Sequence, residues 1–222
     1  MTVFETGPSG RERPGRRLPI WIPLLFMGVV TVALPAMELH IGRLSTTLWI
    51  LTPVVTHGAY GVALLVYVLG MKALARRGAP AGAVGLLLVV IGIAGPVTLR
   101  SFPELRIQAR FLLERPAFDE VAALSDSGRL PASQLGGYLG ARLPDRLCFV
   151  SATCRVKTIG TSGGRPVLFV PDWLGIPDDA VGYARFAARP GGETFDGYGM
   201  RICPTVELAD GWWWMGRCPP TR

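Results

Sequence analysis

Three long segments without any charged residue constrain this chain more than any other feature. They are residues 20–37, 48–70 and 81–99, and none of them contains Asp, Glu, Lys or Arg. A helix needs about 20 apolar residues to cross the hydrocarbon core of a bilayer. Each segment is too long for a buried strand and too evenly apolar for an amphipathic surface helix. The sequence therefore predicts a bundle of three transmembrane helices within residues 20–99.

The composition of the chain and the segments outside the three apolar stretches indicate its organisation. Half of the 222 residues are hydrophobic and only 18% are charged, which favours a membrane protein over a disordered or soluble one. We expect residues 1–19 to be a disordered, basic cytoplasmic N-terminus. Residues 100–222 are expected to form a small extracytoplasmic α+β domain with an antiparallel sheet. The predicted fold class is thus a three-helix transmembrane bundle followed by an exported α+β domain.

Basic residues flank the three segments unevenly. Four arginines precede the first segment and three basic residues separate the second from the third, whereas the loop between the first two carries only Arg43. The positive-inside rule then predicts a multi-pass protein of the plasma (cytoplasmic) membrane with its N-terminus inside and its C-terminal domain outside. Because the basic excess lies beside the apolar segments, the net charge of +7 indicates the lipid bilayer as partner and not nucleic acid.

A cleavable signal peptide is the alternative interpretation of the first segment. Thr31 and Ala33 loosely fit a small-x-small cleavage site after the basic N-terminus. The apolar run continues beyond that site, however, and the second segment follows at once, which favours a retained span.

All four cysteines fall in the part predicted to be exported, at Cys148, Cys154, Cys203 and Cys218. An even number of cysteines confined to an oxidising compartment predicts two disulfides. Zinc is the alternative, but there is no C-x-x-C knuckle and residues 100–222 contain no histidine. We therefore expect no metal site.

One disulfide pairing has a local geometric argument. Asp210-Gly211 is a strong two-residue hairpin signal, and a hairpin centred there places Cys203 opposite Cys218. In the simplest register this pair falls at a hydrogen-bonded position, so a bulge near Pro204 is needed. Cys148 would then pair with Cys154, although four cysteines allow three connectivities and the sequence leaves the choice open.

Residues 100–222 are expected to form a helix followed by a sheet. A capping box at residues 101–104 predicts a helix over 102–114, with one face formed by Leu105, Ala109 and Leu112. Pro116 is expected to break or restart this helix, after which Phe118, Val121 and Ala122 continue an apolar stripe as far as a C-cap near Gly128. Four to six strands should follow, in the regions Arg155–Ile159, Pro166–Val170, Ala180–Ala187, Met200–Leu208 and Trp212–Arg217.

The most unusual string is Trp212-Trp213-Trp214. On a strand the first and third side chains share one face and the second points the other way. The leading interpretation is packing of one face against the sheet. The functional alternative is an exposed aromatic patch that binds an envelope protein or glycan, because tryptophan combines an apolar body with a donor at its edge.

His57 is the other candidate binding residue. It lies within the second apolar segment, where an ionisable side chain indicates function by default. A structural hydrogen bond between helices, with Thr31 at similar depth, is the main interpretation. A proton or ligand role is the alternative.

Catalytic signals are weak, and we expect neither catalytic residues nor a cofactor. Gly160–Gly164 matches G-x-S-x-G, but a second strand follows where a nucleophile elbow needs a helix, and no histidine base is at hand. A general acid and base pair remains open, and the candidates are Asp145, Asp172, Asp178, Asp179, Glu193 and Asp196.

The layout resembles membrane proteins of high-GC Gram-positive bacteria that pair a few N-terminal spans with an exported domain. The resemblance rests on that layout and on the texture of residues 167–179 followed by Gly182-Tyr183, and it implies no activity and no site residues.

The leading functional hypothesis is a non-enzymatic protein whose disulfide-stapled outer domain binds a component of the cell envelope. The second is a small transporter accessory or membrane sensor built around His57. The third is an exported hydrolase of the carboxylate type.

Overall fold

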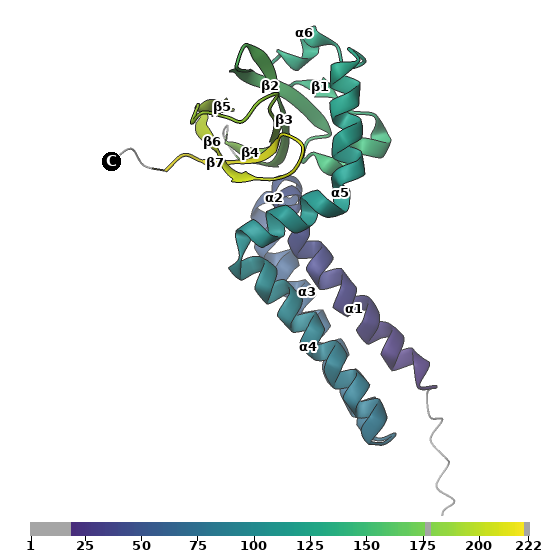
Figure 1. The fold of residues 1–222 in the computed structure, drawn as a ribbon. Helices are drawn as coiled ribbons and strands as arrows, with labels where there is room; N and C mark the ends of the chain where they lie inside the picture. The colour runs from purple at the N-terminus through teal and green to yellow at the C-terminus, as the bar shows by residue number, and fades with distance from the viewer. Residues whose placement is uncertain (1–18, 176–178, 220–222) are drawn as a thin grey trace, which may run out of the picture.

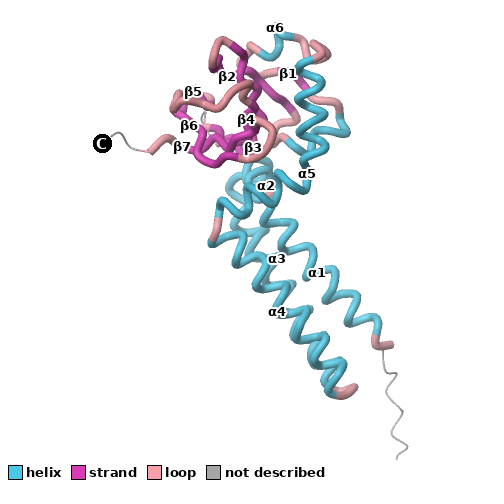
Figure 2. Tube along the Cα trace, viewed as in Figure 1, coloured by secondary structure: helices cyan, strands magenta, loops and turns pink. Residues whose placement is uncertain are grey.

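The computed structural model describes residues 19–175 and 179–219 and contains a long helical bundle and a sheet domain (Figure 1). All the strands lie in the domain, and the bundle is helical (Figure 2). The predicted N-terminal tail falls almost entirely outside the described residues. The bundle consists of α1 (Trp21–Leu39), α2 (Ile41–Leu48), the 3-10 helix η1 (Trp49–Leu51), α3 (Thr52–Ala75) and α4 (Ala79–Ser101).

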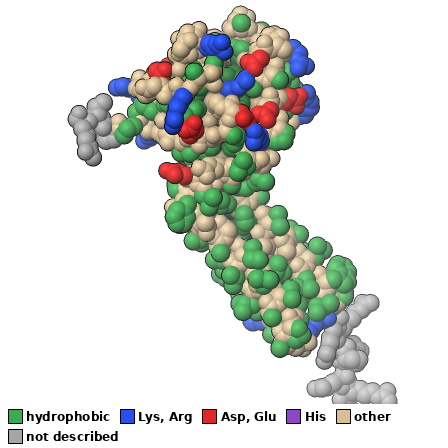
Figure 3. All heavy atoms as spheres, in the orientation of Figure 1, with side chains coloured by type: hydrophobic (Ala, Val, Ile, Leu, Met, Phe, Trp, Pro, Cys, Tyr) green, Lys and Arg blue, Asp and Glu red, His purple; other side chains and the backbone are tan. Residues whose placement is uncertain are grey.

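The three predicted apolar segments form helices that are long and apolar enough to cross a membrane. They are Trp21–Leu39, Ile41–Ala75 and Ala79–Ser101, whose mean hydropathies reach 1.9, 1.7 and 2.3. Their surfaces carry many exposed hydrophobic side chains (Figure 3). The second helical stretch begins at Ile41 instead of residue 48, because the short polar helix α2 precedes it and joins it through Trp49, which has a positive φ of 44°.

A polar contact lies at the centre of the bundle. The Thr31 hydroxyl is 3.1 Å from the Tyr67 hydroxyl and donates to the Met27 carbonyl of its own helix at 2.8 Å. A Cβ at Gly92 of α4 would overlap the Tyr67 phenol, so this glycine lets the two helices approach. The partner of Thr31 is therefore Tyr67 and not His57, which lies nearer the domain end of α3.

The helix α5 (Pro103–Asp126) connects the bundle to the domain and differs from its sequence prediction in two ways. It runs through Pro116 without ending, since the core contacts made by Phe118 and Val121 stabilise the turns beyond the lost hydrogen bond. Its buried face holds Ile107 and Phe111, whereas Leu105 and Leu112 are exposed. The expected end is confirmed, because Gly128 follows the helix with a φ of 68°.

The domain consists of α5 and a curled antiparallel sheet. The strands of this sheet, whose bounds are given below, have the order β1-β2-β3-β4-β7-β6-β5. Because β5 also contacts β2, the sheet forms a half-barrel. The G-x-S-x-G string covers the end of β2 and the turn into β3, which Gly163 and Gly164 form with positive φ, so a strand and not a helix follows it, as its context predicts. The remaining elements are α6 (Ala132–Leu135), β1 (Ala141–Arg142), the 3-10 helix η2 (Asp145–Val150), β2 (Arg155–Ser162), β3 (Arg165–Leu174), β4 (Ala180–Arg185), β5 (Phe195–Gly197), β6 (Met200–Glu207) and β7 (Trp212–Arg217).

The sheet is apolar on both faces. One face packs against α5 through an aromatic group in which the Phe118 ring lies 4.7 Å from Tyr183 and 5.1 Å from Trp212. The other face lines the inside of the curl and holds Phe169 and Met215. Helix α5 is therefore one wall of the domain core as well as a connection.

Both disulfides lie in the domain, and their pairing follows the hairpin argument. Cys148 is bonded to Cys154, and Cys203 to Cys218. The predicted bulge is present beside Pro204, and it shifts the register so that Cys203 lies opposite Gly216. Cys218 directly follows the last residue of β7, two positions beyond Gly216, and is bonded to Cys203 from there. The loop-closure contribution of this disulfide, with a sequence separation of 15, is about 3 kcal/mol.

Candidate functional site

The bundle and the domain meet through α2 and β3. The Leu174 amide donates to the Thr46 hydroxyl at 2.9 Å. At Gly42 a Cβ would lie 2.6 Å from Asp172 Oδ2, so only glycine allows α2 to approach the carboxylate this closely. Residues more than 120 positions apart in sequence are thus in direct contact at the junction.

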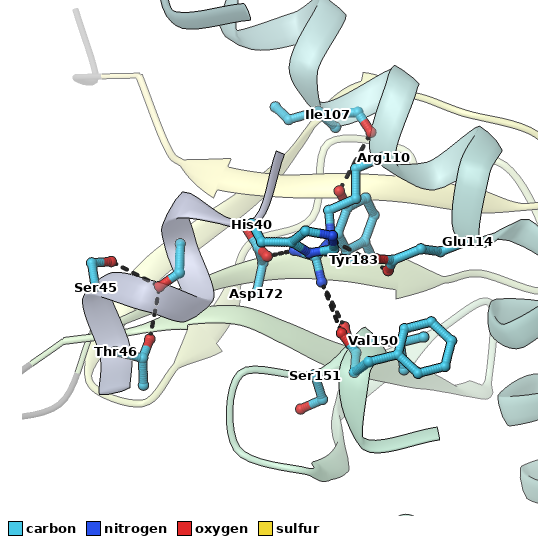
Figure 4. Close-up of polar contacts among 12 residues, drawn as sticks. His40, Ser45, Thr46, Ile107, Arg110, Glu114, Val150, Ser151, Asp172 and Tyr183 are labelled. Atoms are coloured by element: carbon cyan, nitrogen blue, oxygen red, sulfur yellow. Dashed lines mark hydrogen bonds and ion pairs between the residues drawn. The ribbon is translucent and has the colours of Figure 1, made fainter. Parts of the chain in front are cut away.

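A buried cluster of charged side chains lies at this junction (Figure 4). Arg110 of α5 is 2% exposed and forms an ion pair with Asp172 of β3. Its Nε donates to Glu114 Oε2 at 3.3 Å, and Nη2 donates to the Val150 carbonyl at 3.1 Å. The Tyr183 ring lies 5.6 Å from the guanidinium carbon. Four elements of the domain therefore converge on one arginine.

His40, at the corner between α1 and α2, extends the cluster toward solvent. Its Nδ1 lies 3.5 Å from Glu114 Oε1. Burial raises the pKa of Glu114 although Arg110 opposes this, and burial together with Arg110 and Arg43 lowers the pKa of His40. Both groups are thus shifted toward their neutral forms, which leaves Arg110 and Asp172 as the principal charge pair.

This cluster is suited to holding parts of the chain together. Each guanidinium nitrogen of Arg110 faces an oxygen of Asp172, Glu114 or Val150, and burial of Tyr183 raises its pKa to about 12, which keeps the phenol protonated. Removing one partner of a buried ion pair leaves an uncompensated charge, which costs about 3–5 kcal/mol. We name the cluster of Arg110, Asp172, Glu114, Tyr183 and His40 the lock, and we interpret it as the contact that fixes the domain on the bundle.

Beneath the lock, at the domain end of the bundle, lies a cavity of about 490 Å³, hereafter the junction cavity. All five helical elements from α1 to α4 contribute to its wall, and α5 closes it. Apolar side chains such as Trp49 and Leu99 form much of the lining, while Glu38, His57, Arg100 and Arg106 are its ionisable residues.

Neither arginine of the junction cavity is in an ion pair within the described residues, although the charge of the nearby Glu38 partly offsets the effect of burial on the pKa of Arg106. Among the described residues, no carboxylate oxygen lies within 4.0 Å of Arg100 or Arg106. The Glu38 carboxylate accepts a hydrogen bond from Tyr60 at 2.7 Å instead. Burial lowers the pKa of Arg106, yet a guanidinium stays charged at neutral pH. Two positive groups beside apolar walls fit an anion that carries a hydrophobic part.

Two other cavities are weaker candidates. An open groove of about 930 Å³ lies between the end of α5 and the sheet, but its Arg185 is paired with Asp126 at 2.6 Å. Three carboxylates, Asp119, Asp126 and Asp210, line a cleft of about 190 Å³, and each of them forms an ion pair with an arginine. The charges of these three carboxylates are balanced within the chain, whereas Arg165, which also lines the larger groove, forms no ion pair among the described residues.

The structure places the predicted tryptophans mainly in the core. Trp212 is 0% and Trp214 7% exposed, so neither presents a surface to a partner, which favours the packing interpretation. Trp213 is half-buried on the opposite face, and the Arg189 guanidinium lies 5.9 Å from its ring.

His57 lines the junction cavity together with Arg100 and Arg106. Its Nδ1 is 2.6 Å from the Pro53 carbonyl of its own helix. The expected bond between helices is thus replaced by a bond within α3. Among the described residues, the second ring nitrogen, Nε2, makes no hydrogen bond.

Among the described residues, the candidate carboxylates do not assemble into a catalytic pair. Asp172 belongs to the lock, and Asp178 lies outside the described residues. The other four have separate partners, which are Arg142 for Asp145, Arg217 for Asp179, Ser162 for Glu193 and the Gly199 amide for Asp196.

Sequence reasoning missed Arg100, Arg106 and Arg110. A signal was present, because Arg100, Arg106 and Arg110 lie at or soon after the end of the third apolar segment, where the predicted orientation calls for few basic residues. Such a local excess indicates arginines that are retained for a specific contact.

Compared with protein-family models, with curated proteins and with solved structures, the chain has no significant match. Its function is therefore inferred from its own geometry.

Replacing Asp172 by Ala should destabilise the chain by about 3–5 kcal/mol, because Arg110 would stay buried without its main counter-charge. Asp145→Ala is the matched control, since the Asp145 carboxylate and its Arg142 partner are exposed and such a pair contributes about 0–1 kcal/mol. The free energy of unfolding in detergent micelles, from pulse proteolysis, checks this. Equal losses for the two variants would contradict the lock.

The lock also predicts a pH dependence. The fold lowers the pKa of His40 below its ordinary 6.5. Neutral His40 therefore contributes its full stability above about pH 6.5, and this stability is lost as the pH falls from there through the lowered pKa. Between about pH 7 and about pH 5 the wild-type thermal midpoint should therefore fall relative to that of His40→Gln. Protonation of Glu114, which lies against His40, acts in the opposite direction. Parallel curves for the two proteins would contradict the prediction.

Proposed function

We propose that this chain is an integral membrane protein that mounts a non-enzymatic binding domain on the outer face of the plasma membrane and binds an anionic amphiphile at the junction. Three apolar helices and two disulfides support this placement. The basic flanks favour a cytoplasmic N-terminus and an exported domain, where an oxidising compartment would maintain the disulfides.

The unpaired arginines of the junction cavity carry the proposal for the ligand. A guanidinium recognises phosphate and carboxylate groups through parallel donors, and Arg106 is already partly desolvated. The apolar wall at Trp49 and Leu99 would accommodate a hydrocarbon portion. Because the cavity lies where the apolar helices end, the ligand would enter from the surrounding leaflet.

The roles of the lining residues follow from their chemistry. Arg106 and Arg100 would bind the anionic group. The Ser45 hydroxyl and His57 Nδ1 already face the Gly42 and Pro53 carbonyls as donors, so these two side chains would accept hydrogen bonds from hydroxyl groups of the ligand. Glu38 is held by Tyr60, which keeps its carboxylate directed to a partner within the bundle. The sensor or transporter-accessory hypothesis built on His57 shares this cavity, since a sensor of membrane lipids would use the same contacts.

Membrane orientation can be tested directly. A C-terminal fusion to alkaline phosphatase, which is active only after export, should be active in a bacterial host, whereas a C-terminal fusion to green fluorescent protein should be dark. The same reporters joined after Arg77, in the loop between the second and third spans, should give the opposite pattern. Reversed signals at both positions would overturn the orientation, and a soluble fusion protein would overturn membrane insertion.

Lipid binding is tested on the purified full chain in neutral detergent. Energy transfer from tryptophan to dansyl-labelled phosphatidylglycerol should reveal binding that labelled phosphatidylcholine does not match. Arg106→Gln should weaken it about tenfold, the effect of losing one charge-assisted contact. Arg146→Gln is the control, because Arg146 is exposed and paired with Glu120.

Equal binding of the two lipids, or equal affinity of Arg106→Gln and wild type, would refute this ligand class. Inorganic phosphate at matched concentration should not displace the lipid. Displacement by phosphate would refute the requirement for an apolar portion.

A further inference from the structure

Helix α5 has a second apolar face that contacts neither the bundle nor the sheet. Phe102, which caps the helix, and Leu105, Leu112 and Leu113 are between 45% and 71% exposed. We name these four residues the α5 stripe. Large apolar side chains concentrated on one face of a helix mark an interaction surface.

The α5 stripe points away from the domain core. At 100° per residue its side chains cluster on one side of the helix, opposite the side that holds Ile107 and Phe111. Those two residues are buried in the core formed with the sheet. The stripe therefore faces away from the sheet, and this explains why the sequence pattern of Leu105 and Leu112 predicted the wrong core face.

The stripe begins where the apolar bundle ends. Pro103 follows the last residue of α4, Ser101, by two positions. The first turns of α5 cross the domain end of the bundle before the helix rises along the sheet (Figure 1). The stripe is thus continuous with the exposed apolar surface of α4, which ends in Val97.

We propose that the α5 stripe lies in the interfacial region of the leaflet on the domain side. An amphipathic helix parallel to a bilayer buries its apolar face at the headgroup boundary while basic residues contact anionic lipids. Arg100 and Arg106 lie beside the stripe, with no carboxylate partner among the described residues. The inference rests on membrane insertion of the bundle but not on a ligand in the junction cavity.

The consequence is a fixed height for the whole domain. The lock joins α5 to β3 and to the corner of α1 and α2, so a helix seated in the interface would hold the sheet above the headgroups. The mouth of the junction cavity would then lie at headgroup level, where an anionic amphiphile could enter it.

Spin labels on the full chain in phosphatidylglycerol-containing nanodiscs test this placement. Leu113→Cys and Leu105→Cys carry labels on the stripe, and Gln108→Cys carries one on an exposed polar position of the same helix. The ratio of collision rates with oxygen, which concentrates in lipid, and with a water-soluble nickel complex should be severalfold higher at 113 and 105 than at 108. Intact native disulfides, checked by mass spectrometry, show that the labelled chains are folded.

A fourth label separates the two proposals. Leu64 is exposed midway along α3, so Leu64→Cys should show strong oxygen and weak nickel collisions if the bundle crosses the membrane. Lipid exposure at 64 with water exposure at 113 would overturn the stripe alone. Water exposure at 64 would overturn membrane insertion. Shielding of 113 from both reagents would show that a second copy or another protein covers the stripe, which also refutes the inference.

Discussion

The ion pair between Arg110 and Asp172 is the contact on which the arrangement of the two parts depends. It joins α5 to β3, and through Gly42 and His40 it reaches the corner between α1 and α2. Apolar packing favours proximity with little directional preference, whereas a buried guanidinium needs its counter-charge and acceptors in fixed positions. The Val150 carbonyl and Glu114 complete these positions. The lock therefore defines an orientation of the domain as well as its attachment.

The same contact shapes the cavity below it. Helix α5 forms part of the junction cavity through Pro103 and Arg106, one turn before Arg110. Holding Arg110 in the core thus fixes the backbone from which Arg106 extends. The position of a partly desolvated cation is set by a neighbour whose charge is fully compensated, and this preorganisation lowers the cost of binding an anion.

Local patterns predicted the features that depend on neighbouring residues. The apolar segments, the Asp210-Gly211 hairpin with its bulge beside Pro204, and the turn at Gly163 all follow from spacing and turn chemistry. The core face of α5 did not follow, because the helix is apolar on two sides and its sequence cannot show which side meets Tyr183 and Trp212. The lock could not be predicted from the sequence either, because Asp172 follows Arg110 by some sixty residues and only the sheet register brings them together.

The arginines after α4 connect these observations. The predicted orientation places Arg100, Arg106 and Arg110 on the opposite side of the apolar helices from the other basic flanks. Arg110 is neutralised internally by Asp172. The other two line the junction cavity without such a partner among the described residues, and Arg106 is held partly out of water by the fold. A desolvated charge is unfavourable unless something compensates it, and lipid anions would be the abundant compensating groups beside a bundle that crosses a bilayer as we propose. The placement of these charges and the apolar face of α5 therefore support the same proposal, in which the junction contacts the membrane surface.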